Sequence, residues 1–183
     1  MKSTVIYISV WLAATGVAAA LALASPTETS VMGQLPAFIS RTLAQRPMTV
    51  PQDLPSDRTL VLITFNRTQK EQAEGWIEGL NLRGDPSITW MRMPVVNDPG
   101  TAQGRDEAQN RLLGRYPRDD ERANMLPMFI NHENFVRAAG ISGTGQMVAL
   151  IVNRRGEVLA RAEGRFEHGK AANLRETLQG RSY

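Results

Sequence analysis

The sequence predicts an α/β domain in which a mixed β-sheet is covered by helices on both faces. Two segments, residues 59–65 and 146–152, are almost entirely apolar and rich in β-branched side chains, which is typical of buried central strands. Helical and strand-like segments alternate through the first part of the chain, as in sheets with parallel strands. The last part contains a strand, a tight turn and a returning strand, so the sheet must also contain antiparallel pairs.

The N-terminal residues predict a targeting segment that does not belong to the fold. Lys2 precedes an apolar run at residues 5–24, which closes on small residues of the kind that a signal peptidase cuts. We expect residues 1–24 to be an export signal, residues 25–34 a linker and residues 35–180 one domain. About 20 apolar residues also suffice to span a bilayer, so an uncleaved membrane anchor is the alternative. Both alternatives predict a periplasmic or otherwise extracytoplasmic domain, and the uncleaved segment would anchor it to the inner membrane.

A helix follows the first central strand. Ala73, Trp76, Ile77 and Leu80 recur at the spacing of one helical face, and residues 82–86 end the helix.

The middle of the chain predicts a second strand and a second helix. Residues 88–93 alternate in the manner of a strand, which Pro94 is expected to stop. Residues 105–116 predict a helix, and residues 117–123 predict a charged loop.

A third strand is predicted at residues 125–130, and Pro127 confines it to a sheet edge. Asn131 is expected to cap a helix over residues 132–139 that Gly140 ends.

The C-terminal part predicts a hairpin and a last helix. Residues 153–156 form the turn between the second central strand and a returning strand at residues 158–162. Ala171, Leu174 and Leu178 mark a final helix that Gly180 closes.

The composition excludes several kinds of chemistry. The chain has no cysteine, so it has neither disulfide bonds nor a thiolate for redox or nucleophilic work. Only two histidines are present, His132 and His168, and neither has a local metal-binding pattern, so we expect no metal site. The 21 basic and 18 acidic side chains are interspersed, which favours a mixed solvated surface over a nucleic-acid-binding face.

This layout resembles the thioredoxin-like superfamily, in its peroxiredoxin and exported thiol-oxidoreductase branch. Residues 36–54 resemble the lead-in hairpin of that branch, residues 59–65 its first core strand and residues 146–164 its terminal hairpin. The resemblance implies a thioredoxin-like three-layer sandwich, with a mixed central sheet, a terminal β-hairpin and a C-terminal helix. A looser resemblance, in the order of the hairpin and final helix, is to the mitochondrial ATP synthase assembly factors and their bacterial relatives.

Two departures from the superfamily change what the resemblance implies. The loop after the first core strand carries the redox cysteines of the family, and here Lys70 and Ala73 stand about where that pair falls. A cis-proline precedes the terminal hairpin in the family, whereas residues 142–146 contain no proline. Thiol–disulfide exchange and peroxidase activity are therefore excluded, and the family's peptide-clamping geometry is not implied.

We therefore expect a non-catalytic, redox-inactive thioredoxin-like protein of the cell envelope, without a cofactor, that binds a protein or peptide partner, as an assembly factor does. Contact with a membrane is expected only if the N-terminal segment is uncleaved. The predicted partner-binding residues come from the loop after the first core strand, the first helix and the segment before the hairpin: Asn66, Arg67, Thr68, Gln69, Lys70, Trp76, Thr144, Gly145 and Gln146.

An enzyme that uses non-thiol chemistry on this scaffold, for example with glutathione, is the alternative. Thr68 is the one hydroxyl at a suitable position for it. Four methionines are expected to fill gaps in the core, or else to line a binding groove if they are exposed in one patch. These residues are Met91, Met93, Met125 and Met128.

Overall fold

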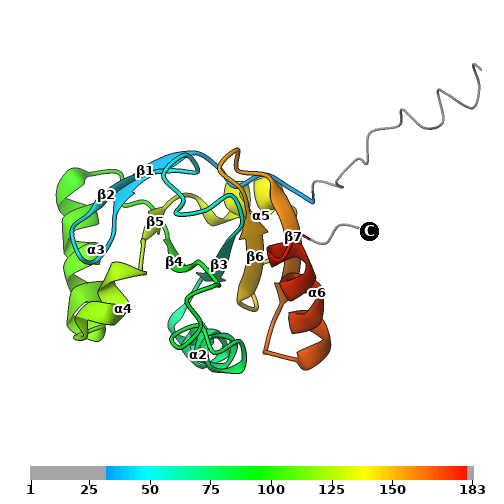
Figure 1. Ribbon diagram of the computed structural model, residues 1–183. Coiled ribbons are helices and arrows are strands. Elements are labelled where there is room, and N and C mark those ends of the chain that lie inside the picture. The colour runs from blue at the N-terminus through cyan, green and yellow to red at the C-terminus, as the bar shows by residue number, and fades with distance from the viewer. Residues whose placement is uncertain (1–31, 181–183) are drawn as a thin grey trace, which may run out of the picture. The chain divides into compact units, whose positions relative to one another are not determined.

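The computed structural model describes residues 32–180 (Figure 1). Its main sheet has five strands in the order β5-β4-β3-β6-β7. The strands are β3 (Thr59–Thr64), β4 (Trp90–Val96), β5 (Met128–Phe129), β6 (Val148–Val152) and β7 (Val158–Glu163). β3 pairs parallel with β4 and antiparallel with β6, β5 is parallel to β4, and β7 is antiparallel to β6. The predicted mixed sheet, its two central strands, its edge strand and its terminal hairpin are confirmed.

The two central strands are buried along their whole length. Because successive side chains of a strand point to opposite faces, they divide between two cores. Val61 and Ile63 of β3 join the core on one face, and Leu60 and Leu62 join the core on the other.

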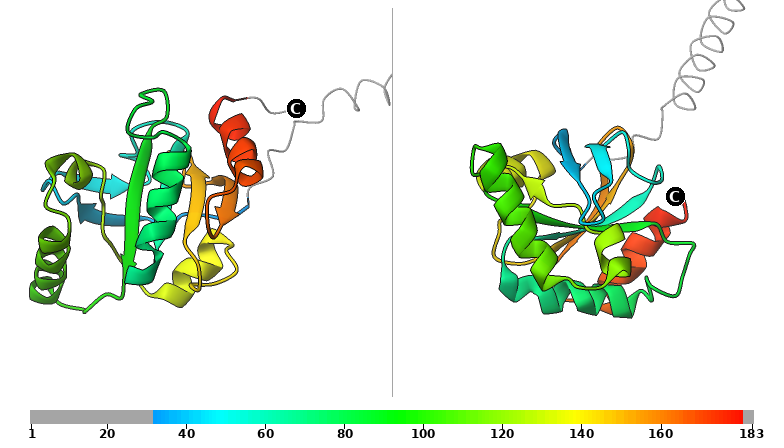
Figure 2. Two further views of the ribbon diagram at one scale, coloured as in Figure 1. Left: turned by 90° about the horizontal axis from the view of Figure 1, so that it is seen from below. Right: turned by 90° about the vertical axis from the view of Figure 1, so that its left-hand side faces the viewer.

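Helices α2 (Lys70–Gly79) and α6 (His168–Leu178) pack on the face of Leu60 and Leu62 (Figures 1 and 2). The face of α2 that the sequence predicts is the one that is buried, and Trp76 in its middle has no exposed surface. The predicted first and last helices are confirmed.

The opposite face is covered by α5 (His132–Ala139) and by a separate hairpin of β1 (Phe38–Arg41) and β2 (Pro47–Val50) (Figure 2). Asn131 caps α5 with its side chain, and Gly140 ends it in the left-handed conformation, as predicted.

Two helices flank the β4–β5 side of the sheet. α3 (Ala102–Arg115) begins a few residues before the predicted start, because Thr101 caps it by accepting a hydrogen bond from the Gly104 N–H. The prediction of a charged loop at residues 117–123 is wrong, because α4 (Asp119–Ala123) forms there. Its acidic residues all lie in the first turn, where the helix dipole favours negative charge.

The prediction that Pro94 stops the second strand is also wrong, because β4 continues through it to Val96. The sheet tolerates this proline because pairing on its outer side is interrupted there. Arg92 exchanges backbone hydrogen bonds with Asn124 and Leu126, and the ladder to β5 resumes only at Val95.

The four methionines are gap-fillers in the core, since each is at most 3 % exposed. The expected N-terminal signal or anchor lies outside the described residues. Within residues 32–180 no helix has both the length and the apolar character needed to cross a bilayer.

Candidate functional site

The strand-end segment, residues 66–70, leads from the carboxyl end of β3 into α2. Asn66 starts a short 3₁₀ turn, η1 (Arg67–Gln69), and its side chain accepts a hydrogen bond of 3.0 Å from the Thr68 N–H. In open α/β sheets ligands bind beside the carboxyl ends of the parallel strands. The strand-end segment lies at that end of the sheet, because β3 and β4 are parallel.

Gln69 ties this segment to the connector, residues 142–146, which precedes β6. Its amide side chain is 1 % exposed; Oε1 accepts a hydrogen bond of 2.7 Å from the Phe65 N–H, and Nε2 donates one of 2.8 Å to the Thr144 carbonyl. Gln72, one turn into α2, accepts a hydrogen bond of 3.1 Å from the Met147 N–H. The structure therefore brings the two predicted halves of the site together.

The other predicted site residues divide between surface and core. Trp76 is fully buried beneath α2, where its indole N–H donates a hydrogen bond of 3.0 Å to the Gly164 carbonyl. Trp76 therefore packs beneath the site, and its side chain is not accessible to a partner. The exposed predicted residues are Asn66, Arg67, Thr68, Lys70, Gly145 and Gln146.

The connector is held at one end and open at the other. Ser142 donates hydrogen bonds from its N–H and its hydroxyl to the Glu163 carboxylate. The backbone groups of Gly145 and Gln146 have no hydrogen-bond partner within residues 32–180. A Cβ placed on Gly145 meets nothing within 4 Å, so this backbone is approachable from solvent.

A cavity of about 380 Å³, which we call the strand-end cavity, lies beside the strand-end segment on its β4 side. It lies among the ends of β3 and β4, the last turn of α3 and the start of α5. Its lining residues are Thr64, Phe65, Asn66, Arg67, Lys70, Pro94, Val95, Val96, Asn97, Leu112, Arg115, Tyr116 and His132.

Three lining residues, Arg115, Tyr116 and His132, are functional candidates that the sequence-based site lacks. Arg115 and Tyr116 end α3, whereas His132 begins α5, and only the fold brings these helix ends next to β3. No local pattern in the sequence predicts that these helix ends lie beside β3. From the sequence, Tyr116 is predicted only as part of an apolar helix face.

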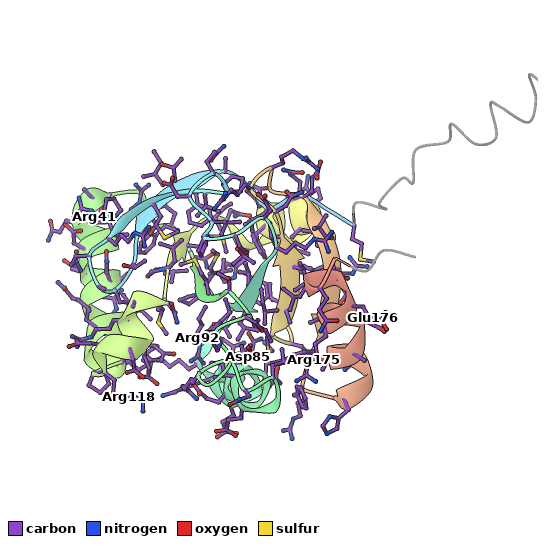
Figure 3. All side chains as sticks on the ribbon, in the orientation of Figure 1. Arg41, Asp85, Arg92, Arg118, Arg175 and Glu176 are labelled. Atoms are coloured by element: carbon purple, nitrogen blue, oxygen red, sulfur yellow. The ribbon has the colours of Figure 1, made fainter. Side chains whose placement is uncertain are left out.

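Arg92 is a buried cation next to Tyr116, one of the residues that line the strand-end cavity. It is 4 % exposed and lies among the interior side chains in Figure 3, whereas Arg118 lies at the edge of the molecule. Its guanidinium forms an ion pair of 2.7 Å with Glu74 of α2 and donates a hydrogen bond of 3.2 Å to the Lys70 carbonyl. Glu74 forms a second ion pair of 2.7 Å with Arg83.

The balance of forces on Glu74 favours its charged form. Burial alone raises the pKa of the Glu74 carboxyl, but hydrogen bonds from Arg83 and Arg92 and the two positive charges outweigh it. The pKa of Glu74 therefore lies below the ordinary value of 4.5. The charge of Arg92 is thus compensated inside the protein.

Tyr116 forms part of the cavity wall, and two cations lie over its ring. The Lys70 ammonium is 5.1 Å and the Arg92 guanidinium 5.4 Å from the ring centroid. Cation–π contacts of this kind hold Lys70 close to the wall of the cavity.

Thr68 carries the hydroxyl on which the enzymatic alternative depends. Among the described residues, this hydroxyl forms a hydrogen bond with Asn66 alone. Its Oγ1 lies 2.6 Å from the Asn66 Oδ1, and within residues 32–180 no carboxylate or imidazole accepts a hydrogen bond from it. A hydroxyl that activates glutathione donates its hydrogen bond to the thiolate, whereas the Thr68 hydroxyl donates to Asn66 in this structure. Thr68 lines a different cavity, of about 330 Å³, together with Gln72, Arg165 and three further residues.

A further cavity, of about 600 Å³, contains none of the predicted site residues. It lies near the start of β4, and both positive side chains, Arg46 and Arg83, and negative ones, Asp53 and Asp85, line it. Across residues 32–180 no three histidine, aspartate or glutamate side chains gather in the manner of a metal site.

Comparison with solved structures shows that the chain has the thioredoxin-like fold. BsSco, a member of the Sco family of cytochrome c oxidase assembly proteins, aligns with a TM-score of 0.52 and 11 % identity over 81 % of this chain and 92 % of BsSco. The exposed lipoprotein thioredoxin of Streptococcus pneumoniae aligns with a TM-score of 0.51 and 14 % identity over 80 % of this chain and all of the other. A thiol:disulfide interchange protein from Bacteroides sp. aligns with a TM-score of 0.50 and 14 % identity over 82 % of this chain and 90 % of the other. No family model and no curated protein matches the sequence.

Proposed function

We propose that this chain is a redox-inactive protein of thioredoxin-like fold that binds a protein or peptide partner in the cell envelope. One observation carries the proposal. At the end of the sheet where the strand-end segment and the connector meet, the chain has no thiol but presents the backbone of Gly145 and Gln146, which is unpaired among the described residues. An extended peptide pairs with backbone groups of this kind.

The proposed role in assembly is supported by the likeness to BsSco, whose family is described as cytochrome c oxidase assembly proteins. The proposed envelope location is supported by the apolar N-terminal run and by the likeness to an exposed lipoprotein. Both are proposals for this chain, because these likenesses concern the fold.

The proposal is tested by affinity capture from envelope extracts with the full chain and two glycine variants. Gly145→Trp places a large side chain over the connector, whereas Gly169→Trp places the same side chain near the start of α6. A Cβ at either position meets nothing within 4 Å, so both variants are expected to fold. We expect Gly145→Trp to reduce capture of a specific partner at least tenfold and Gly169→Trp to leave it unchanged.

Recovery of no partner above background at several salt concentrations contradicts the proposal, as does equal loss with both variants. The alternative, an enzyme of non-thiol chemistry, gains precedence if the purified chain transfers glutathione to an electrophilic substrate and Thr68→Ala abolishes that turnover. The Thr68 hydroxyl donates its hydrogen bond to Asn66 and is not directed at a substrate, so we expect no such loss.

A further inference from the structure

The strand-end cavity carries positive charge on its wall and no negative charge. Arg67, Lys70 and Arg115 line it, and none of its lining residues is an aspartate or a glutamate. Within residues 32–180 none of these three cations forms an ion pair. The large cavity near the start of β4 differs in this respect, since acidic and basic residues both line it.

Most of the remaining wall is apolar. Phe65, Val95, Leu112 and Tyr116 are each at most 8 % exposed, and all line the cavity. A concave site of a few hundred Å³ with apolar walls and a few polar groups is the usual form of a small-ligand site. An occupant therefore needs an apolar body.

The buried Arg92–Glu74 ion pair beside the cavity does not neutralise the charge of the three lining cations. Arg92 lies next to the cavity wall at Tyr116, but Glu74 compensates its charge. Among the residues that the structure describes, the three lining cations have no counter-ion. Positive charge in a partly enclosed cavity attracts an anion more strongly than the same charge on an open surface.

We propose that the strand-end cavity binds an organic anion, in which an apolar group carries a carboxylate. The apolar group packs against Phe65 and Tyr116, and the carboxylate pairs with Arg67, Lys70 and Arg115. A free organic acid and the C-terminal residue of a peptide both supply this chemistry. The inference rests on the proposed function, because the strand-end segment belongs to both sites.

The first experiment compares two probes with the same carbon chain, octanoate and 1-octanol, by NMR titration of the full chain. We expect octanoate to bind at least tenfold more tightly than octanol, with an affinity that falls as salt rises. Backbone and side-chain shifts are expected at Arg67, Tyr116 and the start of α5. Equal affinity for the two probes, or shifts confined to other regions, overturns the inference.

Charge variants locate the interaction. Arg67→Gln combined with Lys70→Gln is expected to raise the Kd for octanoate at least tenfold, and Arg115→Gln alone to raise it severalfold. Arg111→Gln is the matched control, because Arg111 is exposed on the same helix as Arg115 but does not line the cavity. An unchanged Kd in the double variant overturns the inference.

Two peptides distinguish a free organic acid from a peptide C-terminus as the natural ligand. One ends in a free leucine carboxylate, and the other has the same sequence with a C-terminal amide. If the free peptide binds at least tenfold more tightly than the amide and octanoate displaces it, the cavity takes a peptide C-terminus. If octanoate binds and neither peptide does, the cavity takes a free organic acid. Both results support the inference. If neither octanoate nor the free peptide binds, the inference is overturned.

The inference and the proposed function fail in different ways. A partner whose capture is lost in Gly145→Trp, together with a chain that binds neither octanoate nor the peptides, overturns the inference alone. Charge-dependent binding of octanoate by a chain that captures no partner overturns the proposed function alone.

Discussion

Gln69 donates a side-chain hydrogen bond of 2.8 Å to the carbonyl of Thr144, which is 75 positions further along the chain. The same side chain accepts a hydrogen bond from the Phe65 N–H at the end of β3. A single buried amide thus joins the end of one central strand to the approach of the other. The fold holds this end of the sheet together without a cysteine.

Gln69→Ala is expected to lower the free energy of unfolding by about 2–4 kcal/mol, because it removes hydrogen bonds to the buried Phe65 N–H and to the part-buried Thr144 carbonyl. Urea denaturation measures the change. Gln103→Ala on α3 is the control. Gln103 is exposed and its side chain donates a hydrogen bond to exposed Glu107, so we expect a loss under about 0.5 kcal/mol. Similar losses in the two variants contradict the structural role of Gln69.

Arg92→Met is expected to lower the free energy of unfolding by about 2–4 kcal/mol, because it leaves part-buried Glu74 with Arg83 as its only cation. Because Arg83 still pairs with Glu74 in this variant, we expect the loss to lie nearer to about 2 kcal/mol than to about 4 kcal/mol. Arg118→Met removes an exposed arginine from two ion pairs and is expected to cost less than about 1 kcal/mol. A reversed order of the two losses, measured by urea denaturation, contradicts the buried network.

The ionisation of Glu74 predicts a pH dependence of stability. Its folded pKa lies below 4.5, so its contribution is present above pH 4.5 and is lost as the pH falls through the lower folded value. We expect the wild-type chain to be more stable than Glu74→Gln at pH 7, and the difference to shrink below pH 4.5. Denaturation curves from pH 7 to pH 3 measure this difference, and a gap that widens in acid contradicts the sign.

Two glycines predict opposite responses to alanine. Gly140 has φ of 66° and a Cβ there meets the Met32 carbonyl oxygen at 2.3 Å, so Gly140→Ala is expected to destabilise by more than about 1 kcal/mol. Gly114 lies within α3, where a Cβ meets nothing within 4 Å, so Gly114→Ala is expected to stabilise by about 0.5–1 kcal/mol. Thermal melts distinguish the signs, and two changes of the same sign contradict the backbone geometry.

Most of the fold was predictable because its signals are local. The β-branched runs that form β3 and β6, the spacing of Ala73, Trp76 and Ile77 in α2, and the Asn131 cap each specify an element within a few residues. The errors arose where tertiary context overrides a local rule. Pro94 remains in β4 because pairing with β5 is interrupted beside it, and α4 forms because its charges suit a helix start.

The candidate site was only partly predictable. The sequence indicated the strand-end segment through the position of residues 66–70 after the first core strand, and the structure brings it to the connector. It gave no sign that Arg115 and Tyr116, at the end of α3, lie beside that segment. Contacts between residues so far apart in sequence depend on how the helices pack, which residue pattern alone does not encode.

Site-specific photocrosslinking in intact cells measures whether a partner docks at the carboxyl end of β3. Benzoylphenylalanine replaces Arg67, Gln146 or Asp57, of which the first two flank the carboxyl end of β3 and the third precedes its other end; all three are exposed. We expect the first two positions to capture the same protein and position 57 to capture none. A protein captured only from position 57, or no adduct from positions 67 and 146, contradicts partner binding at this end of the sheet.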